Sequence, residues 1–200
     1  MLAASRRHTL QLMNREQLTI PNIITVARIL VTPLMAVMLA RDPVAWAIPA
    51  ILIGLTDVLD GFLARRFNWI TELGRILDPT ADVIYTSAIA IALAVAGVLP
   101  VPLMAATLLQ KALKTVITGM AAIRLKGVKT HVTDFGKAVE VVTNVGVAGF
   151  MLAKLTPDEW YDPLRIVATV VTIAGILAGF INAWRMYQQY QQIKADSQKS

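Results

Sequence analysis

Six long apolar stretches constrain the fold of this chain more than any other feature of its sequence. A helix needs about 20 mostly apolar residues to cross the hydrocarbon core of a bilayer. The stretches that approach or reach this length are approximately residues 23–40, 44–64, 83–99, 101–123, 138–155 and 164–183. We therefore expect an all-α integral membrane protein with six transmembrane helices.

The composition of the chain supports a membrane protein over a soluble one. Hydrophobic residues make up 56% of the 200 residues and charged residues 16%, whereas about 25% of a typical soluble protein is charged. This balance excludes a disordered chain and argues against a soluble nucleic-acid-binding protein, although the net charge is +6. On so apolar a chain, basic residues are typical of segments that face an anionic membrane leaflet.

The distribution of lysine and arginine predicts the orientation of the chain. Most of these 19 residues lie before residue 20, in the connections 65–75 and 124–137, and after residue 184. Because cytoplasmic segments carry an excess of basic residues, we expect both termini in the cytoplasm.

We expect one domain over residues 1–200. Residues 1–20 are polar and basic, which predicts an amphipathic helix on the membrane surface and not a cleaved signal peptide. Residues 21–184 would form the six-helix bundle, followed by a polar helical tail at 185–200.

Four aspartates lie at the ends of two predicted spans, where charged side chains are costly and indicate a functional site by default. Asp57 and Asp60 are three residues apart in the second span, and Asp78 and Asp82 are four apart at the start of the third. Residues at these spacings share one face of a helix. One such pair is more often a solvated helix end, but two matched pairs on antiparallel neighbours predict four carboxylates converging near the cytoplasmic interface.

Four carboxylates cannot all stay ionised close together without counter-charge. Arg65, Arg66 and Arg75 are near in sequence, but arginines at an interface can stay hydrated. The chain has no cysteine and two histidines, which excludes thiolate and histidine-rich metal sites. An all-oxygen site suits Mg²⁺ or Mn²⁺. Two such ions among the carboxylates would hold a diphosphate for a displacement at phosphorus.

The order and spacing of eight residues resemble the signature of the CDP-alcohol phosphatidyltransferase family. They are Asp57, Asp60, Gly61, Ala64, Arg65, Gly74, Asp78 and Asp82. Six transmembrane helices in this orientation are also typical of the family. The resemblance implies an enzyme of phospholipid biosynthesis that exchanges the CMP of CDP-diacylglycerol for an alcohol, at the cytoplasmic face of a bacterial cell membrane.

The resemblance also implies roles for individual residues. Asp57, Asp60, Asp78 and Asp82 would bind two Mg²⁺ or Mn²⁺ ions, and Asp82 would be the general base that deprotonates the acceptor hydroxyl. The residues implied to contact the CDP-lipid are Ile20, Pro21, Asn22, Ile23, Gly61, Ala64, Arg65, Thr71 and Gly74.

The segments around the aspartates resemble the phosphatidylglycerophosphate synthase and cardiolipin synthase branches of the family. Glycerol 3-phosphate is therefore the acceptor we expect, with phosphatidylglycerol as the alternative. Candidate ligands for an acceptor phosphate are Lys111, Lys114 and Lys137, with Glu140 and Asp134 as possible ion-pair partners. Lysines near helix ends more often extend towards the headgroups.

At one place the sequence departs from the pattern of phosphatidylglycerophosphate synthases, and this difference bears on the identity of the acceptor. Phosphatidylglycerophosphate synthases typically have a Gly-Lys-x-Lys-Thr run at the start of the fifth span, where this chain has Gly136-Lys137-Ala138. The Gly-Lys-Ala form resembles some cardiolipin synthases of the same fold. Phosphatidylglycerol therefore stays open as the acceptor.

Two other functions are compatible with four aspartates in membrane spans. A divalent-cation transporter would need a polar path to the far side, but residues 44–54 and 90–99 carry no polar side chain except the indole of Trp46. An inactive scaffold subunit would normally lack one of the aspartates. Gly175 and Gly179 allow close helix approach, either within the bundle or in the homodimer that the resemblance implies.

Overall fold

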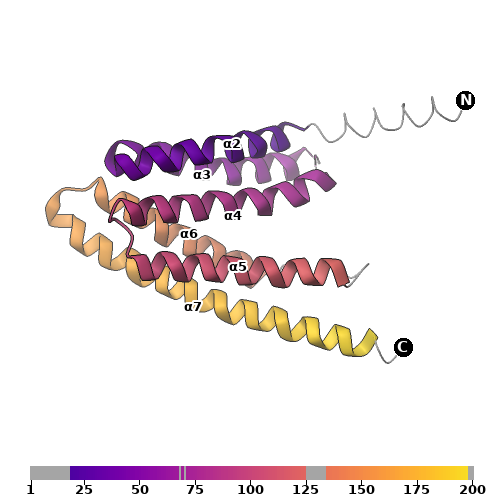
Figure 1. Ribbon diagram of the computed structural model, residues 1–200. Coiled ribbons are helices and arrows are strands. Elements are labelled where there is room, and N and C mark those ends of the chain that lie inside the picture. Colours follow the sequence, from indigo (N-terminus) through magenta and orange to yellow (C-terminus); the bar gives the residue numbers. More distant parts are fainter. Residues whose placement is uncertain (1–18, 68, 70, 125–133, 198–200) are drawn as a thin grey trace, which may run out of the picture. The chain divides into compact units, whose positions relative to one another are not determined.

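Every helix in the described part of the chain is long, and no strand occurs among these residues, which confirms the all-α class (Figure 1). This computed structural model describes residues 19–67, 69, 71–124 and 134–197. The helices are α2 (Ile20–Arg41), α3 (Pro43–Arg66), α4 (Glu72–Val95), α5 (Val101–Arg124), α6 (Asp134–Lys154) and α7 (Asp158–Ser197). The interfacial helix predicted over residues 1–20 lies outside the described residues except for its last two.

Four of these helices are long and apolar enough to cross a membrane, where the sequence predicts six spans. They are α2, α3 over Pro43–Leu63, α4 over Leu77–Val95, and α7 over Asp158–Gln192. Helices α5 and α6 coincide with the other two predicted spans. Polar residues such as Lys111 and Lys114 in α5 and Glu140 in α6 lower the mean hydropathy of these two helices.

The helix bounds differ from the predicted spans most clearly in α4. This helix begins at Glu72, so Asp78 and Asp82 lie inside a continuous helix and not at its first turn. It ends at Val95, and Gly97 then adopts a φ of +70°, a left-handed conformation that glycine accepts without strain. Between α2 and α3, the Asp42 carboxylate accepts hydrogen bonds from Val44 N at 3.1 Å and Ala45 N at 3.0 Å.

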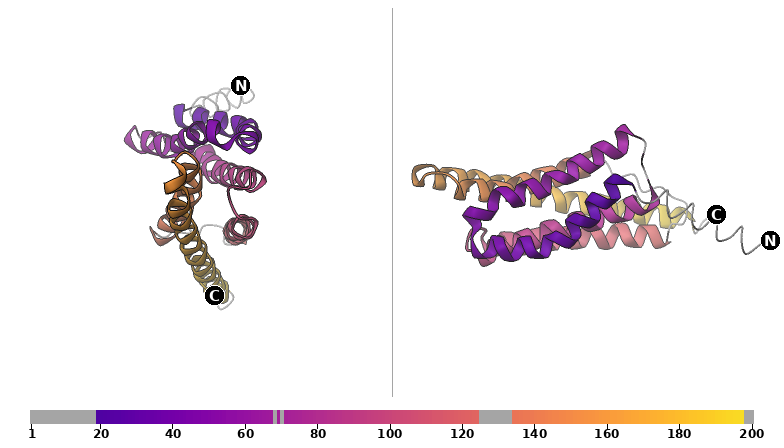
Figure 2. Two further views of the ribbon diagram at one scale, coloured as in Figure 1. Left: turned by 90° about the vertical axis from the view of Figure 1, so that its left-hand side faces the viewer. Right: turned by 90° about the horizontal axis from the view of Figure 1, so that it is seen from above.

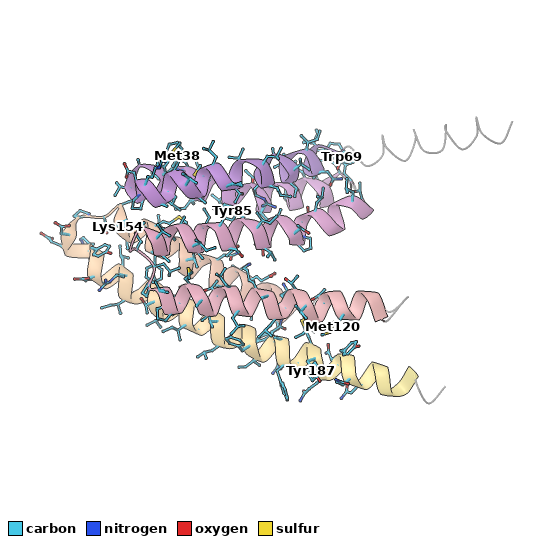
Figure 3. The ribbon with its side chains drawn as sticks, in the orientation of Figure 1. Met38, Trp69, Tyr85, Met120, Lys154 and Tyr187 are labelled. Atoms are coloured by element: carbon cyan, nitrogen blue, oxygen red, sulfur yellow. The ribbon has the colours of Figure 1, made fainter. Side chains whose placement is uncertain are left out.

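The helices form two compact units, residues 1–92 and 93–200. In the first, α2 and α3 run side by side, as both directions of view show (Figures 1 and 2). Polar side chains at helical spacing on α2 are buried, namely Asn22, Thr25, Arg28 and Thr32. The apolar side chains of Leu30 and Leu34 are instead 73% and 60% exposed. This inverted pattern is expected where lipid surrounds the protein. Figure 3 draws the side chains of the described residues, with Met38 of α2 and Tyr85 of α4 labelled.

In the second unit, glycines bring α7 close to its neighbours. A Cβ on Gly146 of α6 would lie 2.8 Å from Thr172 N, and one on Gly175 of α7 would lie 2.9 Å from Thr143 N. Gly179 faces the side chain of Gln110 on α5. Both glycines of the Gly175–Gly179 pair are therefore used in packing within the chain. The predicted homodimer stays a prediction.

Candidate active site

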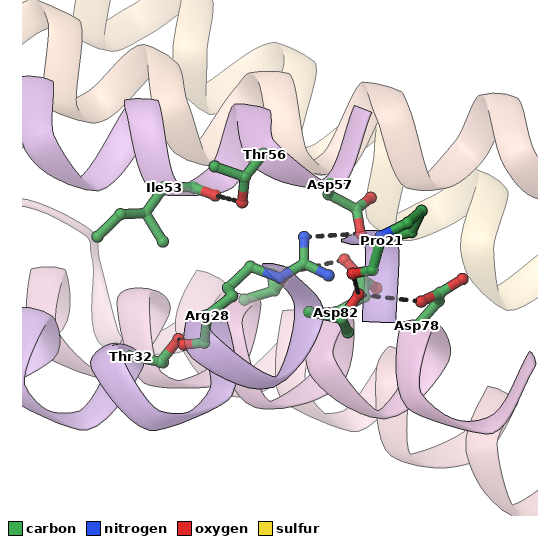
Figure 4. A network of polar contacts seen from close by, with 10 residues as sticks. Pro21, Arg28, Thr32, Ile53, Thr56, Asp57, Asp78 and Asp82 are labelled. Carbon is green, nitrogen blue, oxygen red and sulfur yellow. Dashed lines mark hydrogen bonds and ion pairs between the residues drawn. The ribbon is translucent and has the colours of Figure 1, made fainter. Parts of the chain in front are cut away.

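An ion pair inside the first unit joins α2 to the first of the four aspartates that are predicted to bind metal ions. Arg28 Nη1 lies 2.7 Å from Asp57 Oδ1 (Figure 4). The side chain of Arg28 is 2% exposed, whereas that of Asp57 is 45% exposed. The cation is therefore enclosed, and the carboxylate lies at the edge of the enclosed space.

The aspartates of α4 are held by threonine hydroxyls. Thr25 Oγ1 donates to Asp78 Oδ1 at 3.3 Å and also lies 3.0 Å from the carbonyl oxygen of Pro21. Thr86 Oγ1 donates to Asp82 Oδ1 at 3.3 Å. Because Thr25 and Arg28 are on the same face of α2, that helix connects Asp57 of α3 with Asp78 of α4. The side chain of Asp60 lies outside the described part of the chain.

Three residues predicted to contact the CDP-lipid meet at the start of α4. Asn22 Nδ2 donates to Thr71 Oγ1 at 2.8 Å, and the same oxygen accepts from Gly74 N at 2.9 Å. A Cβ on Gly74 would lie 2.8 Å from Asn22 Oδ1. A glycine at position 74 therefore lets Asn22 reach Thr71.

The other residues predicted to contact the CDP-lipid are less closely gathered. Pro21 is buried, and Gly61 is half-buried in α3. Ile20 and Ile23 are each 54% exposed on the outer side of α2. The side chains of Ala64 and Arg65 lie outside the described residues.

The predicted metal site stays a prediction. Among the described residues, no group of three or more His, Cys, Asp or Glu side chains is arranged to hold a metal ion. The counter-charge for Asp57 comes from Arg28, a residue for which sequence reasoning suggested no role. The sequence does contain a signal for this role of Arg28, because it is a lone arginine deep in an apolar span. A buried charge requires a partner of opposite charge.

A second polar cluster lies within the other unit, among α5, α6 and α7. Lys111 is buried, with 6% of its surface exposed, and Lys114 forms an ion pair with Glu140, as predicted. The side-chain oxygen Oε1 of Gln110 is buried and accepts no hydrogen bond from the described residues. These residues line a pocket with Gly136, Val139, Thr143, Gly179 and Asn182. The side chains of Lys137 and Asp134 lie outside the described residues.

Comparison with known protein families gives one extended match. Residues 18–189 match the family model described as CDP-alcohol phosphatidyltransferase. The match includes α2 to α6, most of α7, all four aspartates and both polar clusters.

Curated relatives carry two different names. A Streptomyces coelicolor protein named cardiolipin synthase (CMP-forming) is 38% identical over 110 residues, which are 52% of this chain and 51% of that protein. A human protein of the same name is 40% identical over 89 residues, 42% of this chain and 29% of that protein.

A third relative, from Aquifex aeolicus, is named CDP-diacylglycerol–glycerol-3-phosphate 3-phosphatidyltransferase. It is 34% identical over 70 residues, 34% of this chain and 39% of that protein. The aligned regions thus span about half or less of the length of these relatives.

Proposed function

The chain belongs to the CDP-alcohol phosphatidyltransferase family, and on that premise we propose that it transfers the phosphatidyl group of CDP-diacylglycerol to an alcohol in phospholipid biosynthesis. In this reaction the acceptor oxygen forms a bond to the lipid-side phosphorus, and the bond from that phosphorus to the oxygen of CMP breaks. The observation that carries the proposal is the polar network of α2, α3 and α4, in which Arg28 pairs with Asp57 and Thr25 donates a hydrogen bond to Asp78.

The four aspartates fit a pair of divalent cations by the chemistry of their donor atoms. Asp57, Asp60, Asp78 and Asp82 offer only carboxylate oxygens, which Mg²⁺ and Mn²⁺ prefer. When bound, two such ions would neutralise the diphosphate and the developing charge on CMP.

The residues of the chain itself would orient the substrates and move the proton. Asp82 would accept the proton of the acceptor hydroxyl, and the hydroxyl of Thr86 holds one of its oxygens in place. Asn22, Thr71 and Gly74 would contact the CDP-lipid, together with Ile20, Pro21, Ile23, Gly61, Ala64 and Arg65. The acyl chains of the lipid can stay in the bilayer throughout.

We further propose one catalytic domain over residues 1–200 with six transmembrane helices. Helices α5 and α6 would complete the bundle, because their polar residues face each other in the pocket and need not meet lipid. The termini and the aspartates would face the cytoplasm of a bacterial cell, as the excess of basic residues at the termini and connections suggests. The homodimer is part of the same proposal.

The proposed acceptor is glycerol 3-phosphate, whose phosphate Lys111, Lys114 and Lys137 would bind. One observation favours phosphatidylglycerol as a second candidate. Glu140 pairs with Lys114 and so lowers the net positive charge of the pocket. Less positive charge suits a phosphodiester with one negative charge better than a phosphomonoester with two. The names of the Streptomyces and human relatives point in the same direction.

The test is CMP release by the purified full chain with CDP-diacylglycerol, Mn²⁺ or Mg²⁺, and one acceptor at a time. Release with glycerol 3-phosphate alone would support a phosphatidylglycerophosphate synthase, and release with phosphatidylglycerol alone a cardiolipin synthase. No release with any acceptor, together with Mn²⁺ flux into vesicles containing the protein, would overturn the proposal in favour of a cation transporter.

A further inference from the structure

Arg28 is an enclosed cation in the middle of a candidate membrane span. It lies within α2, whose window Ile20–Arg41 is apolar enough to cross a membrane, and only 4% of the residue is exposed. A guanidinium keeps its charge under all conditions found in proteins. An anion must therefore stay beside Arg28 at every stage of a catalytic cycle.

The carboxylate of Asp57 has more freedom to move than the guanidinium of Arg28. The Asp57 side chain is 45% exposed, against 2% for Arg28. The carboxylate can therefore turn to another cation, whereas the guanidinium cannot leave for water. A metal ion bound by Asp57 would compete with Arg28 for the negative charge of that side chain.

Once metal ions bind, the neighbouring carboxylates are less able to balance the charge of Arg28. Asp78 receives the hydroxyl of Thr25 one helical turn before Arg28, and Asp82 receives the hydroxyl of Thr86. In the proposed function these two carboxylates also belong to the metal ions. The diphosphate of the CDP-lipid, which binds together with the metal ions, is then the anion that can balance the charge of Arg28.

We propose that Arg28 is the counter-ion of Asp57 in the metal-free protein and binds a diphosphate oxygen of the CDP-lipid once a divalent cation has taken Asp57. This inference rests on the proposed function. It assigns a substrate contact to a residue of α2 that is distant in sequence from the aspartate signature. It also predicts that the metal ion and Arg28 compete for the carboxylate of Asp57 before the substrate binds, and that both bind the diphosphate afterwards.

The first measurement is Mn²⁺ binding to the full chain in detergent without substrate, followed by electron paramagnetic resonance. Arg28→Gln removes the competing cation, and we expect it to bind Mn²⁺ about tenfold more tightly, the scale of one charged hydrogen bond. The control is Arg41→Gln, an exposed arginine at the other end of α2. An unchanged Mn²⁺ affinity in Arg28→Gln, or equal tightening in Arg41→Gln, would overturn the counter-ion assignment.

The second measurement is binding of CDP-glycerol at saturating Mn²⁺, which reports the diphosphate contact without turnover. We expect Arg28→Gln to bind CDP-glycerol at least tenfold more weakly than the wild-type chain, and Arg41→Gln to bind it equally well. Arg28→Lys keeps the charge but loses the planar fork of donors. It should therefore retain the wild-type Mn²⁺ affinity and lose part of the CDP-glycerol affinity.

Arg28→Lys also carries the test if Arg28→Gln does not fold. Wild-type CDP-glycerol affinity in Arg28→Lys would then overturn the substrate contact, as would wild-type affinity in a folded Arg28→Gln. A wild-type chain that binds neither Mn²⁺ nor CDP-glycerol would instead overturn the proposed function, and this inference with it. Tighter Mn²⁺ binding by Arg28→Gln in a chain that releases no CMP would support the counter-ion assignment independently of the reaction.

Discussion

At the scale of single residues, the polar contacts of the first unit depend on the size and charge of individual side chains. Gly74 is the clearest case, because the space of its missing Cβ is taken by the amide of Asn22. That amide is buried and donates to Thr71, so it cannot simply rotate into solvent. Position 74 therefore requires glycine because a larger side chain would collide with Asn22, and not because the backbone at this position is unusual.

We therefore expect Gly74→Ala to raise the KM for CDP-diacylglycerol several-fold with a smaller effect on kcat. The added Cβ would lie 2.8 Å from Asn22 Oδ1 and would force Asn22 away from Thr71. Steady-state CMP release over a range of CDP-diacylglycerol concentrations measures this. Gly119→Ala in α5 is the matched control, because a Cβ there meets nothing within 4 Å. An unchanged KM in Gly74→Ala would show that Asn22 does not position the lipid nucleotide.

Asp82→Asn tests the proposed general base. The amide keeps the size of the carboxylate and can still accept from Thr86, so we expect the folded protein to accumulate normally. It cannot take a proton, and CMP release should fall by at least about a hundredfold, the scale of general base catalysis. Near-normal turnover in a variant with an unchanged melting temperature would contradict the assignment.

At the scale of helices, close approach between α6 and α7 depends on glycines that face backbone. A Cβ at position 146 or 175 would lie within 3 Å of backbone atoms of the opposite helix, and backbone cannot move aside as a side chain can. The sequence alone left Gly175 and Gly179 open between dimerisation and packing. Only the position of the neighbouring helices could decide between dimerisation and packing within the chain, because the same small-residue motif serves both.

We expect Gly146→Ala and Gly175→Ala each to destabilise the protein by about 1–3 kcal/mol, the usual cost of overpacking. Thermal unfolding in detergent, followed by circular dichroism, measures the change. Gly119→Ala serves again as control and should be neutral or slightly stabilising, because alanine favours helix more than glycine does. Equal melting temperatures for all three variants would mean that α6 and α7 are not in contact at these glycines.

The Lys114–Glu140 ion pair offers a second test at this scale. Glu140→Gln leaves Lys114 without its carboxylate partner in a half-buried pocket, and we expect a loss of stability. Adding Lys114→Gln should recover part of that loss, because the uncompensated charge is then gone. A double-mutant cycle by thermal unfolding gives the coupling energy. Additive effects of the two substitutions would show that the pair contributes nothing.

At the scale of the whole molecule, both units bury polar side chains beside an apolar core and expose many large apolar side chains. Buried residues include Thr25, Thr32, Thr107, Thr143 and Thr172, while large aliphatic side chains on the same helices are exposed. Thr32, Thr107, Thr143 and Thr172 each donate to a carbonyl one turn earlier in their own helix. The hydroxyl is thereby satisfied without water, which a chain surrounded by lipid requires.

The predicted orientation can be tested directly, because the chain has no cysteine of its own. We expect a cysteine at Ser200 to be protected from a membrane-impermeant maleimide in intact cells. A cysteine at exposed Asp162, near the start of α7, should be labelled under the same conditions. Labelling of both in permeabilised cells controls for reactivity. The opposite pattern would reverse the proposed topology.

The sequence by itself determined the all-α membrane class, the family and the order of the long helices along the chain, but not every helix end, since α4 begins at Glu72 and not at residue 83. These follow from local properties, since apolar length, helical spacing and a motif of eight residues are all read along one chain. It also named Glu140 and Asp134 as possible partners of Lys111 and Lys114, because a lysine deep in an apolar helix needs a nearby carboxylate, and the structure pairs Lys114 with Glu140.

Only the tertiary structure decided which residues meet. It paired Arg28 with Asp57, placed Asn22 against Gly74 and turned Gly175 and Gly179 towards helices of the same chain. Such contacts join segments far apart in sequence, and they depend on the rotation of each helix about its own axis. All the side chains packed between two helices together determine that rotation, so it cannot be predicted from any single motif.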